Sequence, residues 1–406
     1  MPPSGAGLLD IICLSHLAWE QTLFQRPQQL MRQMEARGHR VLYCGCIGLQ
    51  PLRNLQERRG SRRGRFGNGG AFINHFYSPY TRRMVWMART AAVAAVAQAA
   101  REVLYTPVRP TFRSRPERRP TGPLLWLYHP GLLPLALMLR PSRIVYDVMD
   151  RFASFALRDF SHTHWERDLL AMASTVFTGG RSLHAACEAE IALLRAANRW
   201  HNKPFVCLPS GVDAAHFARA LKPLLRVPPD IAALPKPVFG YHGAIDERVD
   251  FDLLRALCLG MPQASVVLIG PVLGRPDDLP PNLHLIGPRP YEDLPACIKG
   301  FDVCLIPFRR TDLVAHVSPT KTPEYLAAGK PVVSTPIPDV EYDYGDLVTI
   351  ASQPDEFLAA CQAAASRPPD PQWLSAQAAQ RARSWAAIAA LMEAAITGQS
   401  PLPEPA

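Results

Sequence analysis

The stretch "SPTKTPEYLAAGKPVVST", Ser318–Thr335, joins a short helical pattern to a β-branched run. Ser318 or Thr320 is suited to cap a helix, and Pro323 fits the first helical turn. Gly329 and the Lys-Pro pair after it end the helical pattern, and the apolar "VVS" then indicates a buried strand. A helix that leads directly into a buried strand is the repeating unit of a parallel α/β sheet.

The same alternation of short apolar runs and amphipathic stretches continues through the chain. In the first half we expect strands at Leu8–Ser15, Arg40–Gly45, Ala71–Ser78, Leu124–His129, Arg143–Asp147, Thr175–Gly179 and Phe205–Pro209. In the second half we expect them at Val238–Gly243, Ser265–Gly270, Leu283–Gly287, Val303–Phe308, Pro331–Ser334 and Leu347–Ile350. Two series of strands with crossover helices predict an α/β protein of two Rossmann-like parallel-sheet domains, with a ligand site in the cleft between them.

Changes in composition suggest where one domain ends and the next begins. Residues 1–215 form the predicted N-terminal domain and residues 238–375 the C-terminal domain, with the Pro-rich 216–237 as a linker between them. An Ala-rich helix is expected at 376–397, followed by a disordered Pro-rich tail at 398–406. Neither domain has a Gly-x-Gly-x-x-Gly after its first strand, which argues against a dinucleotide oxidoreductase.

Length and composition exclude several classes of protein. A chain of 406 residues with 48% hydrophobic and 19% charged residues indicates a globular protein of more than one domain. The nine cysteines lie mostly in apolar runs without metal-binding spacing, which predicts reduced thiols in a cytosolic protein. We expect no secretion signal and no membrane span, because no apolar stretch has the required form.

Basic residues are concentrated in two segments of a chain whose net charge is +9. Residues 53–70 ("RNLQERRGSRRGRFGNGG") carry six arginines, and residues 109–120 carry five. One interpretation is a pair of solvated, mobile loops. The other is an electrostatic landing surface for anionic lipid or an anionic substrate. Nucleic acid is disfavoured, because no recognition motif accompanies the arginines.

The charged residues of Ser318–Thr335 suggest a chemistry for the cleft. The helix N-terminus favours an anion, and Lys321 adds a point charge suited to phosphate. Glu324 lies about one turn further along, where its carboxylate suits two sugar hydroxyls better than a phosphate. A nucleoside diphosphate would use both residues, with its phosphates on Lys321 and its ribose on Glu324. The alternative is a capped surface helix with an exposed lysine.

Several segments together resemble one enzyme family. Beside the opening stretch, they are "FQRPQQLMRQMEARGHRVLY" (24–43), "IVYDVMD" (144–150), "LPSGVDAAHF" (208–217), "GYHGAIDERVDFDLL" (240–254) and "LIGPRPYEDLPACIKGFDVCLIPF" (285–308). The set is similar to GT-B glycosyltransferases, above all family-4-like enzymes and the transferases of teichuronic acid and exopolysaccharide synthesis. The resemblance implies an acceptor-side N-terminal domain and a donor-binding C-terminal domain. It also implies that the last helix, 376–397, crosses back to the N-terminal domain.

The resemblance carries a donor-binding set onto this sequence. The residues are Gly243, Arg248, Tyr291, Ser318, Thr320, Lys321, Thr322 and Glu324. In the family, backbone N–H groups near Gly243 meet the donor phosphates, Arg248 is a diphosphate-binding cation and Glu324 binds the ribose. Arg248 is alternatively a surface arginine paired with Asp246 or Asp250, and Tyr291 a packing residue. Many members have two glutamates eight positions apart; Glu324 matches the second, and His316 stands at the position of the first, so the stereochemistry stays open.

Acceptor and catalytic residues are expected in the N-terminal domain. Trp19 and Gln25 lie in the loop after the first strand and are candidates for the acceptor side. His16, His129 and Asp150 follow strands and are the catalytic candidates, because an inverting enzyme needs a carboxylate or histidine base. A retaining enzyme of this fold needs no such base, and His129 is alternatively structural.

The resemblance implies a glycosyltransferase that moves a sugar from a nucleotide diphosphate sugar, with a UDP-sugar favoured, to a glycan or lipid-linked acceptor. It implies no cofactor and no metal. We expect a cytoplasmic location, with peripheral association at an anionic membrane surface left open, and no nucleic-acid partner. Two other functions remain open: a non-hydrolysing nucleotide-sugar epimerase and a non-catalytic GT-B partner subunit.

Overall fold

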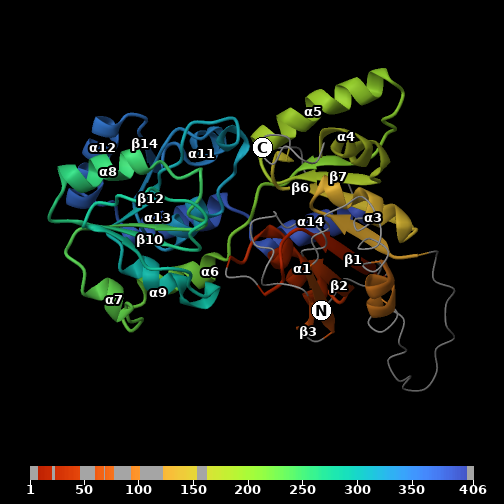
Figure 1. Ribbon diagram of the computed structural model, residues 1–406, viewed down its shortest axis with the longest axis horizontal. Helices are drawn as coiled ribbons and strands as arrows, with labels where there is room; N and C mark the ends of the chain where they lie inside the picture. Colours follow the sequence, from red (N-terminus) through yellow and green to blue (C-terminus); the bar gives the residue numbers. More distant parts are fainter. Residues whose placement is uncertain are drawn as a thin grey trace.

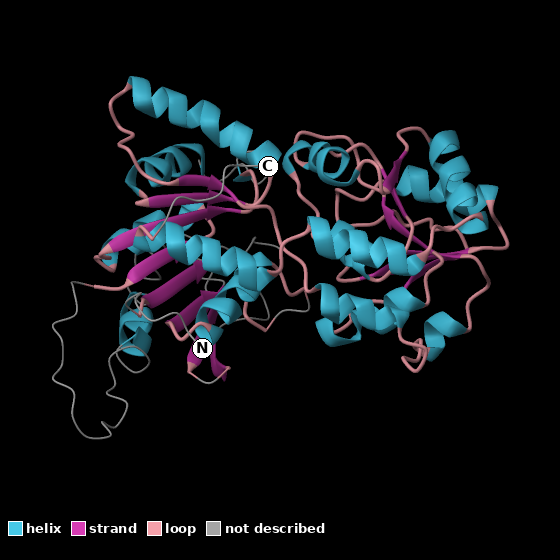
Figure 2. Cartoon of the chain, turned by 180° about the vertical axis from the view of Figure 1, so that it is seen from behind, coloured by secondary structure: helices cyan, strands magenta, loops and turns pink. Residues whose placement is uncertain are grey.

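A computed structural model describes residues 8–20, 23–45, 60–67, 69–76, 93–100, 122–152 and 162–399. The described chain forms two lobes, each built on one sheet (Figure 1). Helices lie on both faces of each sheet (Figure 2). The arrangement is the two-domain α/β fold that the alternation of strand and helix patterns predicts.

The first sheet has eight strands. In spatial order they are β3 (Gly60–Phe66), β4 (Gly70–Phe76), β2 (Arg40–Gly45), β1 (Asp10–Ser15), β5 (Leu124–Leu127), β6 (Arg143–Val148), β7 (Thr175–Thr178) and β8 (Phe205–Cys207). All neighbouring pairs are parallel except β3 with β4. The strand order changes direction between β1 and β5, so the carboxyl ends of these two strands mark the switch point of the sheet.

The second sheet has six strands, all parallel. Their spatial order is β11 (Leu283–Leu285), β10 (Ser265–Ile269), β9 (Val238–His242), β12 (Val303–Ile306), β13 (Val332–Ser334) and β14 (Val348–Ile350). Here the order changes direction between β9 and β12. The loops after these strands are therefore where a ligand is expected to bind.

Helices connect the strands as crossovers. Those of the first domain are α1 (Arg26–Ala36), α3 (Leu133–Met138), α4 (His162–Met172) and α5 (Arg181–Ala196). Those of the second domain are α6 (Ala214–Phe217), α7 (Pro229–Ala232), α8 (Phe251–Gly260), α9 (Leu294–Lys299), α10 (Lys321–Ala327), α11 (Pro338–Tyr344), α12 (Pro354–Ser366) and α13 (Pro371–Arg381). The last helix is α14 (Trp385–Thr397). Within the described ranges, no helix is both long and apolar enough to cross a bilayer.

The central strands are apolar on both faces because helices cover both faces. Ile12 and Leu14 of β1 pack into one core cluster, whereas Ile11 and Cys13 pack into another on the opposite face. All four side chains are at most 2% exposed. Successive side chains of a strand point to opposite faces, so a continuous apolar run is what a doubly covered parallel strand requires.

Strand β3 lies inside the arginine-rich segment 53–70, where loops were expected. It pairs with β4 in antiparallel register, and Arg63 and Arg65 are exposed. A Cβ atom at Gly64 would lie 2.4 Å from the Phe72 ring, so the glycine lets that ring pack against the strand. Periodicity missed β3 because five of its seven residues are Gly or Arg, which leaves no alternation of apolar and polar residues to recognise. Residues 46–59 and 101–121, including the second arginine-rich segment, lie outside the described residues.

The predicted linker 216–237 is wrong in the structure. Phe217 and Ile231 are fully buried in the core of the second domain. Leu208 packs in a core cluster of the first domain and Val212 in that of the second, so the chain passes between the domains near Gly211. Pro-rich composition suggested a spacer, but the apolar residues between the prolines supply enough buried area to pack.

The predicted helix 376–397 is divided. Helix α13 belongs to the second domain, and the chain leaves the helical conformation between it and α14. Only α14 returns to the first domain, where Trp385, Ile388 and Met392 join the core beneath β1. Figure 1 shows α14, in blue, beside α1 in the N-terminal lobe. The tail from residue 400 onward lies outside the described residues.

Candidate functional site

A cavity between the domains lies at the carboxyl ends of both sheets and is called here the interdomain cavity. Its volume is about 150 Å³. The first domain contributes Leu23, Phe24, Gln25, Arg26, Met149, Asp150 and Ser210. The second contributes Tyr241, His242, Gly243, Ala244, Arg248, Ile269, Gly270, Arg289, Tyr291, Leu294, Val317, Ser318, Pro319, Thr320, Lys321 and Glu324.

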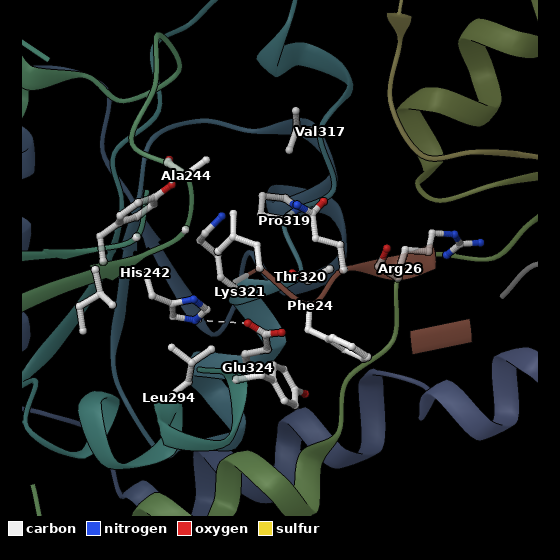
Figure 3. A pocket seen from close by; sticks show the side chains of 18 of the residues that line it. Phe24, Arg26, His242, Ala244, Leu294, Val317, Pro319, Thr320, Lys321 and Glu324 are labelled. Atoms are coloured by element: carbon white, nitrogen blue, oxygen red, sulfur yellow. Dashed lines mark hydrogen bonds and ion pairs between the residues drawn. The ribbon is translucent and has the colours of Figure 1, made fainter. Parts of the chain in front are cut away.

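Lys321 begins α10 and points its ammonium group into the cavity (Figure 3). Its Nζ lies 4.9 Å from the ring centroid of Phe308 and 5.2 Å from that of Tyr241. Burial, and secondarily the positive charge of Arg248, lower the pKa of Lys321 to about 8. The ligand-free site thus holds a desolvated cation, which an anion would stabilise.

Arg248 lies in the loop after β9 and lines the same cavity. Its guanidinium forms a two-pronged ion pair with Asp246, with Nε–Oδ1 at 2.9 Å and Nη2–Oδ2 at 2.6 Å. The two interpretations of Arg248 are therefore compatible, because it is both paired and directed at the cleft. Asp246 fixes the orientation of the Arg248 guanidinium, and a diphosphate could bind to the same guanidinium.

Gly243 follows β9 with φ +144°, a conformation that side chains rarely adopt. A Cβ there would lie 2.8 Å from the Tyr241 hydroxyl oxygen and 3.2 Å from Lys321 Cε. The N–H of Gly243 donates to the Ile269 carbonyl at 2.9 Å. The N–H of Gly243 is therefore already paired in the ligand-free structure, and phosphate binding by backbone N–H groups near Gly243 stays a prediction. The glycine also keeps the cavity wall open beside Lys321.

Glu324 lies one turn beyond Lys321 and is 6% exposed. Its Oε2 is 3.3 Å from Nε2 of His242, the residue that ends β9 (Figure 3). Tyr291 lines the cavity nearby, and the His216 ring stacks on it at a centroid distance of 4.5 Å. A carboxylate beside an aromatic wall is suited to a polar ligand that also has a flat apolar part.

The start of α10 differs in part from the expected donor loop. Thr320 is the N-cap residue, but its side chain makes no capping hydrogen bond. Ser318 and Thr320 line the cavity, whereas Thr322 is fully buried and does not. The helix has seven residues, and Glu324 is an acidic residue in its first turn.

Two of the first-domain candidates reach the cavity. Asp150 follows β6, and Gln25 is the N-cap of α1, whose side chain accepts from the third helical N–H in a capping box. Burial raises the pKa of Asp150 to about 6, with the Arg248 charge acting in the opposite direction. A carboxyl group with that pKa can accept or release a proton near neutral pH.

His16, His129 and Trp19 do not line the cavity. The Nδ1 of His129 accepts from the Gly131 N–H at 3.0 Å, so this histidine caps the short turn Pro130–Leu132. His16 lies beside His129, with ring centroids 5.4 Å apart, at the switch point between β1 and β5. Burial lowers the pKa of His16 to about 4. Chain position alone could not reveal these packing contacts.

Trp19 belongs to an aromatic cluster of the first domain. Its ring stacks on Phe66 of β3 at a centroid distance of 3.9 Å and meets Tyr43 edge-on at 5.1 Å. In this structure the ring packs against strand β3 and does not line the interdomain cavity, and its expected acceptor-side role stays a prediction.

Sequence reasoning missed three residues at the cavity. Arg26 is 2% exposed and pairs with the fully buried Asp147, with Nη2–Oδ1 at 2.9 Å. Phe24 extends toward Tyr291 of the other domain, with ring centroids 5.8 Å apart. His242 contacts Glu324. Phe24 lies in the loop after the first strand, which was already assigned to the cleft, and Arg26 begins the helix that follows this loop. Nothing in the local pattern indicates which way His242 points.

The two domains also contact each other beside the cavity. The Asp339 carboxylate of α11 accepts the backbone N–H groups of Arg181 and Ser182, at 3.0 and 2.9 Å, and so caps α5 of the first domain. His316, at the position of the family's first glutamate, lies 2.7 Å from the Arg151 guanidinium through its Nε2. These contacts hold the domains close together.

Metal-binding potential is low where the structure is described. Across those ranges, no three His, Cys, Asp or Glu side chains gather in a way that could hold a metal ion. The positive charge at the interdomain cavity comes from Arg26, Arg248, Arg289 and Lys321.

Comparison with known proteins defines the class. Residues 236–367 match the family model described as "Glycosyl transferases group 1". Residues 236–367 therefore match a group 1 glycosyltransferase domain, and the described chain has the GT-B fold.

One curated relative is the "Putative teichuronic acid biosynthesis glycosyltransferase TuaH" of Bacillus subtilis (strain 168). It is 25% identical over 265 residues, which cover 59% of this chain and 62% of TuaH. The matched part is thus less than two thirds of that relative.

Solved structures show the same fold over nearly the whole chain. Sucrose-phosphate synthase from Thermosynechococcus elongatus has a TM-score of 0.63 at 18% identity, covering 94% of this chain and 97% of its own. Anabaena Alr3699/HepE in complex with UDP and glucose has a TM-score of 0.60 at 15% identity, covering 96% and 99%. At these identities the likeness is one of fold.

Proposed function

We propose that the protein is a glycosyltransferase that moves a sugar from a nucleotide diphosphate sugar to a glycan or lipid-linked acceptor. The observation that carries the proposal is the convergence of Lys321, Arg248 and Glu324 on one interdomain cavity at the switch point of the second sheet. Two cations suit a diphosphate, and the carboxylate suits sugar hydroxyls. A UDP-sugar is the favoured donor, which agrees with the UDP complexes of the fold relative Alr3699/HepE.

In the proposed reaction, the bond between sugar and diphosphate breaks and negative charge develops on the leaving diphosphate. Lys321 and Arg248 lie where they can stabilise that charge, which is the largest electrostatic need of the step. We propose that these side chains supply the charge without a metal ion. Gly243 leaves room for the diphosphate beside Lys321.

Of the three catalytic candidates, we propose Asp150 as the acceptor base if the reaction inverts configuration. Its carboxyl group lines the cavity from the acceptor side, and its pKa is raised to about 6. Asp150→Asn is expected to lower kcat by about 100-fold or more and to leave UDP affinity within about twofold. The rate of the parent should fall with decreasing pH through about 6. A full rate in Asp150→Asn would favour a retaining reaction without this base.

The proposed donor can be tested by thermal shift with UDP, GDP, dTDP and their sugars. A nucleotide at about 100 times its dissociation constant stabilises the folded protein by about 2.7 kcal/mol. The proposal predicts a shift with UDP and UDP-sugars, and release of UDP only when an acceptor is present. Turnover of the nucleotide sugar without an acceptor would identify an epimerase. No shift with any nucleotide would favour a non-catalytic subunit.

We also propose a cytoplasmic protein that meets its lipid-linked acceptor at an anionic membrane surface. The cysteines of the described residues are all free, which suits a reducing compartment, and β3 exposes Arg63 and Arg65. Binding to anionic vesicles should be salt-sensitive. Replacing Arg58, Arg59, Arg62 and Arg63 by Ser should weaken vesicle pelleting and leave UDP binding intact. Equal pelleting of variant and parent at low salt would contradict this proposal.

A further inference from the structure

His242 lies at the carboxyl end of the second sheet, beside the interdomain cavity. It ends β9, the central strand beside the switch point of the second sheet, and its side chain lines the interdomain cavity. The residue is 6% exposed. Its backbone N–H donates to the Tyr325 hydroxyl at 2.8 Å, so the end of the strand is tied to α10.

Aromatic side chains fix the orientation of the imidazole ring. Tyr325 meets the ring edge-on, with centroids 5.0 Å apart and planes at 87°. Phe217 lies nearly parallel to it at 6.5 Å. A ring held in this way cannot turn freely, so the direction of its Nε2 atom is set by the packing.

That direction is toward Glu324. The Nε2–Oε2 distance is 3.3 Å, and both side chains are 8% exposed (Figure 3). In the described part of the chain, this buried Nε2 has no well-aligned hydrogen-bond partner. A buried polar nitrogen of this kind is costly unless a ligand satisfies it.

We propose that His242 is a positioning and specificity-determining residue for the donor's ribose, an inference that rests on the proposed function. Glu324 accepts two sugar hydroxyl protons. His242, with its proton on Nε2, donates to the oxygen of the hydroxyl that binds Oε2. That hydroxyl is then used both as donor and as acceptor.

This arrangement predicts strong selection for ribose over a deoxyribose. A donor without the doubly bound hydroxyl would leave the Glu324 carboxylate and the His242 N–H with only their 3.3 Å contact to each other in a buried site. Sites built to bind a hydroxyl reject analogues that lack it far more strongly than apolar pockets reject a missing methylene. If His242 only fills space against Tyr325, it contributes nothing to that selection.

The test is calorimetric titration of the full chain with UDP, 2′-deoxy-UDP and 3′-deoxy-UDP. Three variants are compared with the parent: His242→Phe keeps the aromatic packing, His242→Gln restores an N–H donor, and His201→Gln changes an exposed histidine as a control. Melting curves without ligand accompany each titration. The decisive readout is the ratio of dissociation constants, deoxy form to UDP.

The parent should bind UDP at least about 30-fold more tightly than one of the two deoxy forms. His242→Phe should lose about 10-fold in UDP affinity and reduce that ratio to about 3-fold, because only Glu324 remains. His242→Gln should keep most of the ratio, and His201→Gln all of it. If His242→Phe does not fold, His242→Asn, whose amide cannot reach the position of Nε2, must show the same loss.

An unchanged ratio in His242→Phe or His242→Asn, with normal UDP binding by the parent, would overturn the role of His242 alone. Failure of the parent to bind UDP would instead overturn the proposed function. The two failures are therefore distinguishable in one set of titrations.

Discussion

At the scale of single residues, Lys321 is held in an environment that disfavours its charged form. Lys321 is held over two aromatic rings with a pKa of about 8, against 10.5 for an ordinary lysine. Burial and the like charge of Arg248 disfavour its charged form. Such strain at a cavity wall is typical of a group that is to be neutralised by a ligand.

The first prediction concerns pH. Between pH 8 and 10.5 the folded protein binds fewer protons at Lys321 than the unfolded chain does, so the free energy of unfolding rises with pH in this window. The destabilisation is fully present below pH 8. Lys321→Met should therefore raise the melting temperature of the ligand-free protein at pH 7 and abolish this part of its pH dependence.

Diphosphate binding has the opposite dependence, because it needs the charged lysine. UDP affinity of the parent should fall as the pH rises above about 8, whereas the weaker affinity of Lys321→Met should stay flat. Titrations at pH 7 and pH 9.5 measure both. A parallel decline in the two proteins would show that Lys321 does not contact the diphosphate.

The second prediction uses two glycines in loops of the second domain. Gly243 has φ +144°, and a Cβ there would make close contacts, whereas a Cβ at Gly274 would meet nothing within 4 Å. Gly243→Ala should destabilise the protein by about 1–3 kcal/mol and weaken UDP binding about 10-fold or more. Gly274→Ala should change neither. Melting curves and titrations of both variants provide the measurement, and equal behaviour would contradict the close-approach role of Gly243.

At the scale of elements, the sequence predicts what depends on local pattern. Strands β2, β9 and β10 begin at the expected residues, and each ends within one residue of its expected end, because Gly or Pro punctuates the apolar runs. Strand β3 and the packing of residues 216–237 were missed, since both depend on contacts with distant residues such as Phe72.

The site likewise combines residues whose position follows from local sequence pattern with residues whose position depends on distant contacts. The structure brings Arg248, Lys321 and Glu324 to one cavity, as expected for residues near the carboxyl ends of parallel strands. It also brings His242 there and leaves His129 and Trp19 outside. Whether a side chain near a strand end faces the cleft or the core depends on the neighbouring domain and on more distant strands such as β3, which sequence patterns do not specify.

The third prediction concerns α14, the helix that returns to the first domain. Glu393 is 7% exposed and pairs with Arg37 and, at 3.3 Å, with Nε2 of His39. Glu393→Ala leaves these partners without their acceptor and should lower the free energy of unfolding by about 1–3 kcal/mol. Glu190→Ala removes an exposed pair and should cost less than about 1 kcal/mol. Similar losses in the two variants would argue against a stabilising α14 anchor.

At the scale of the whole molecule, the cavity and the interdomain contacts describe a closed form. The cavity volume of about 150 Å³ is smaller than the roughly 300–1,000 Å³ of most ligand pockets. We therefore expect the domains to separate when a nucleotide sugar enters. The Asp339 carboxylate resists separation by accepting hydrogen bonds from the N-terminus of α5. The Asp343 carboxylate adds an ion pair with the Arg181 guanidinium, with Nε–Oδ1 at 2.8 Å.

The fourth prediction follows from this contact. Asp339→Ala removes both hydrogen bonds to α5 and should shift the equilibrium toward an open form by about 10-fold. The radius of gyration from small-angle scattering should rise, and UDP should associate faster. Asp277→Asn, at an exposed aspartate, is the control. Identical scattering curves for Asp339→Ala and the parent would exclude Asp339 as the contact that holds the domains closed.

The central claim is that Glu324 and Lys321 bind the nucleotide of the donor, and calorimetric titration with UDP tests it most directly. The account predicts one UDP site in the parent, a loss of about 10- to 150-fold in Lys321→Ala, and weaker binding in Glu324→Gln with a nearly unchanged melting temperature of the ligand-free protein. Glu341→Gln, at an exposed glutamate of α11, should bind like the parent. If Lys321→Ala and Glu324→Gln also bind UDP like the parent, the assignment of the donor site to this stretch is contradicted.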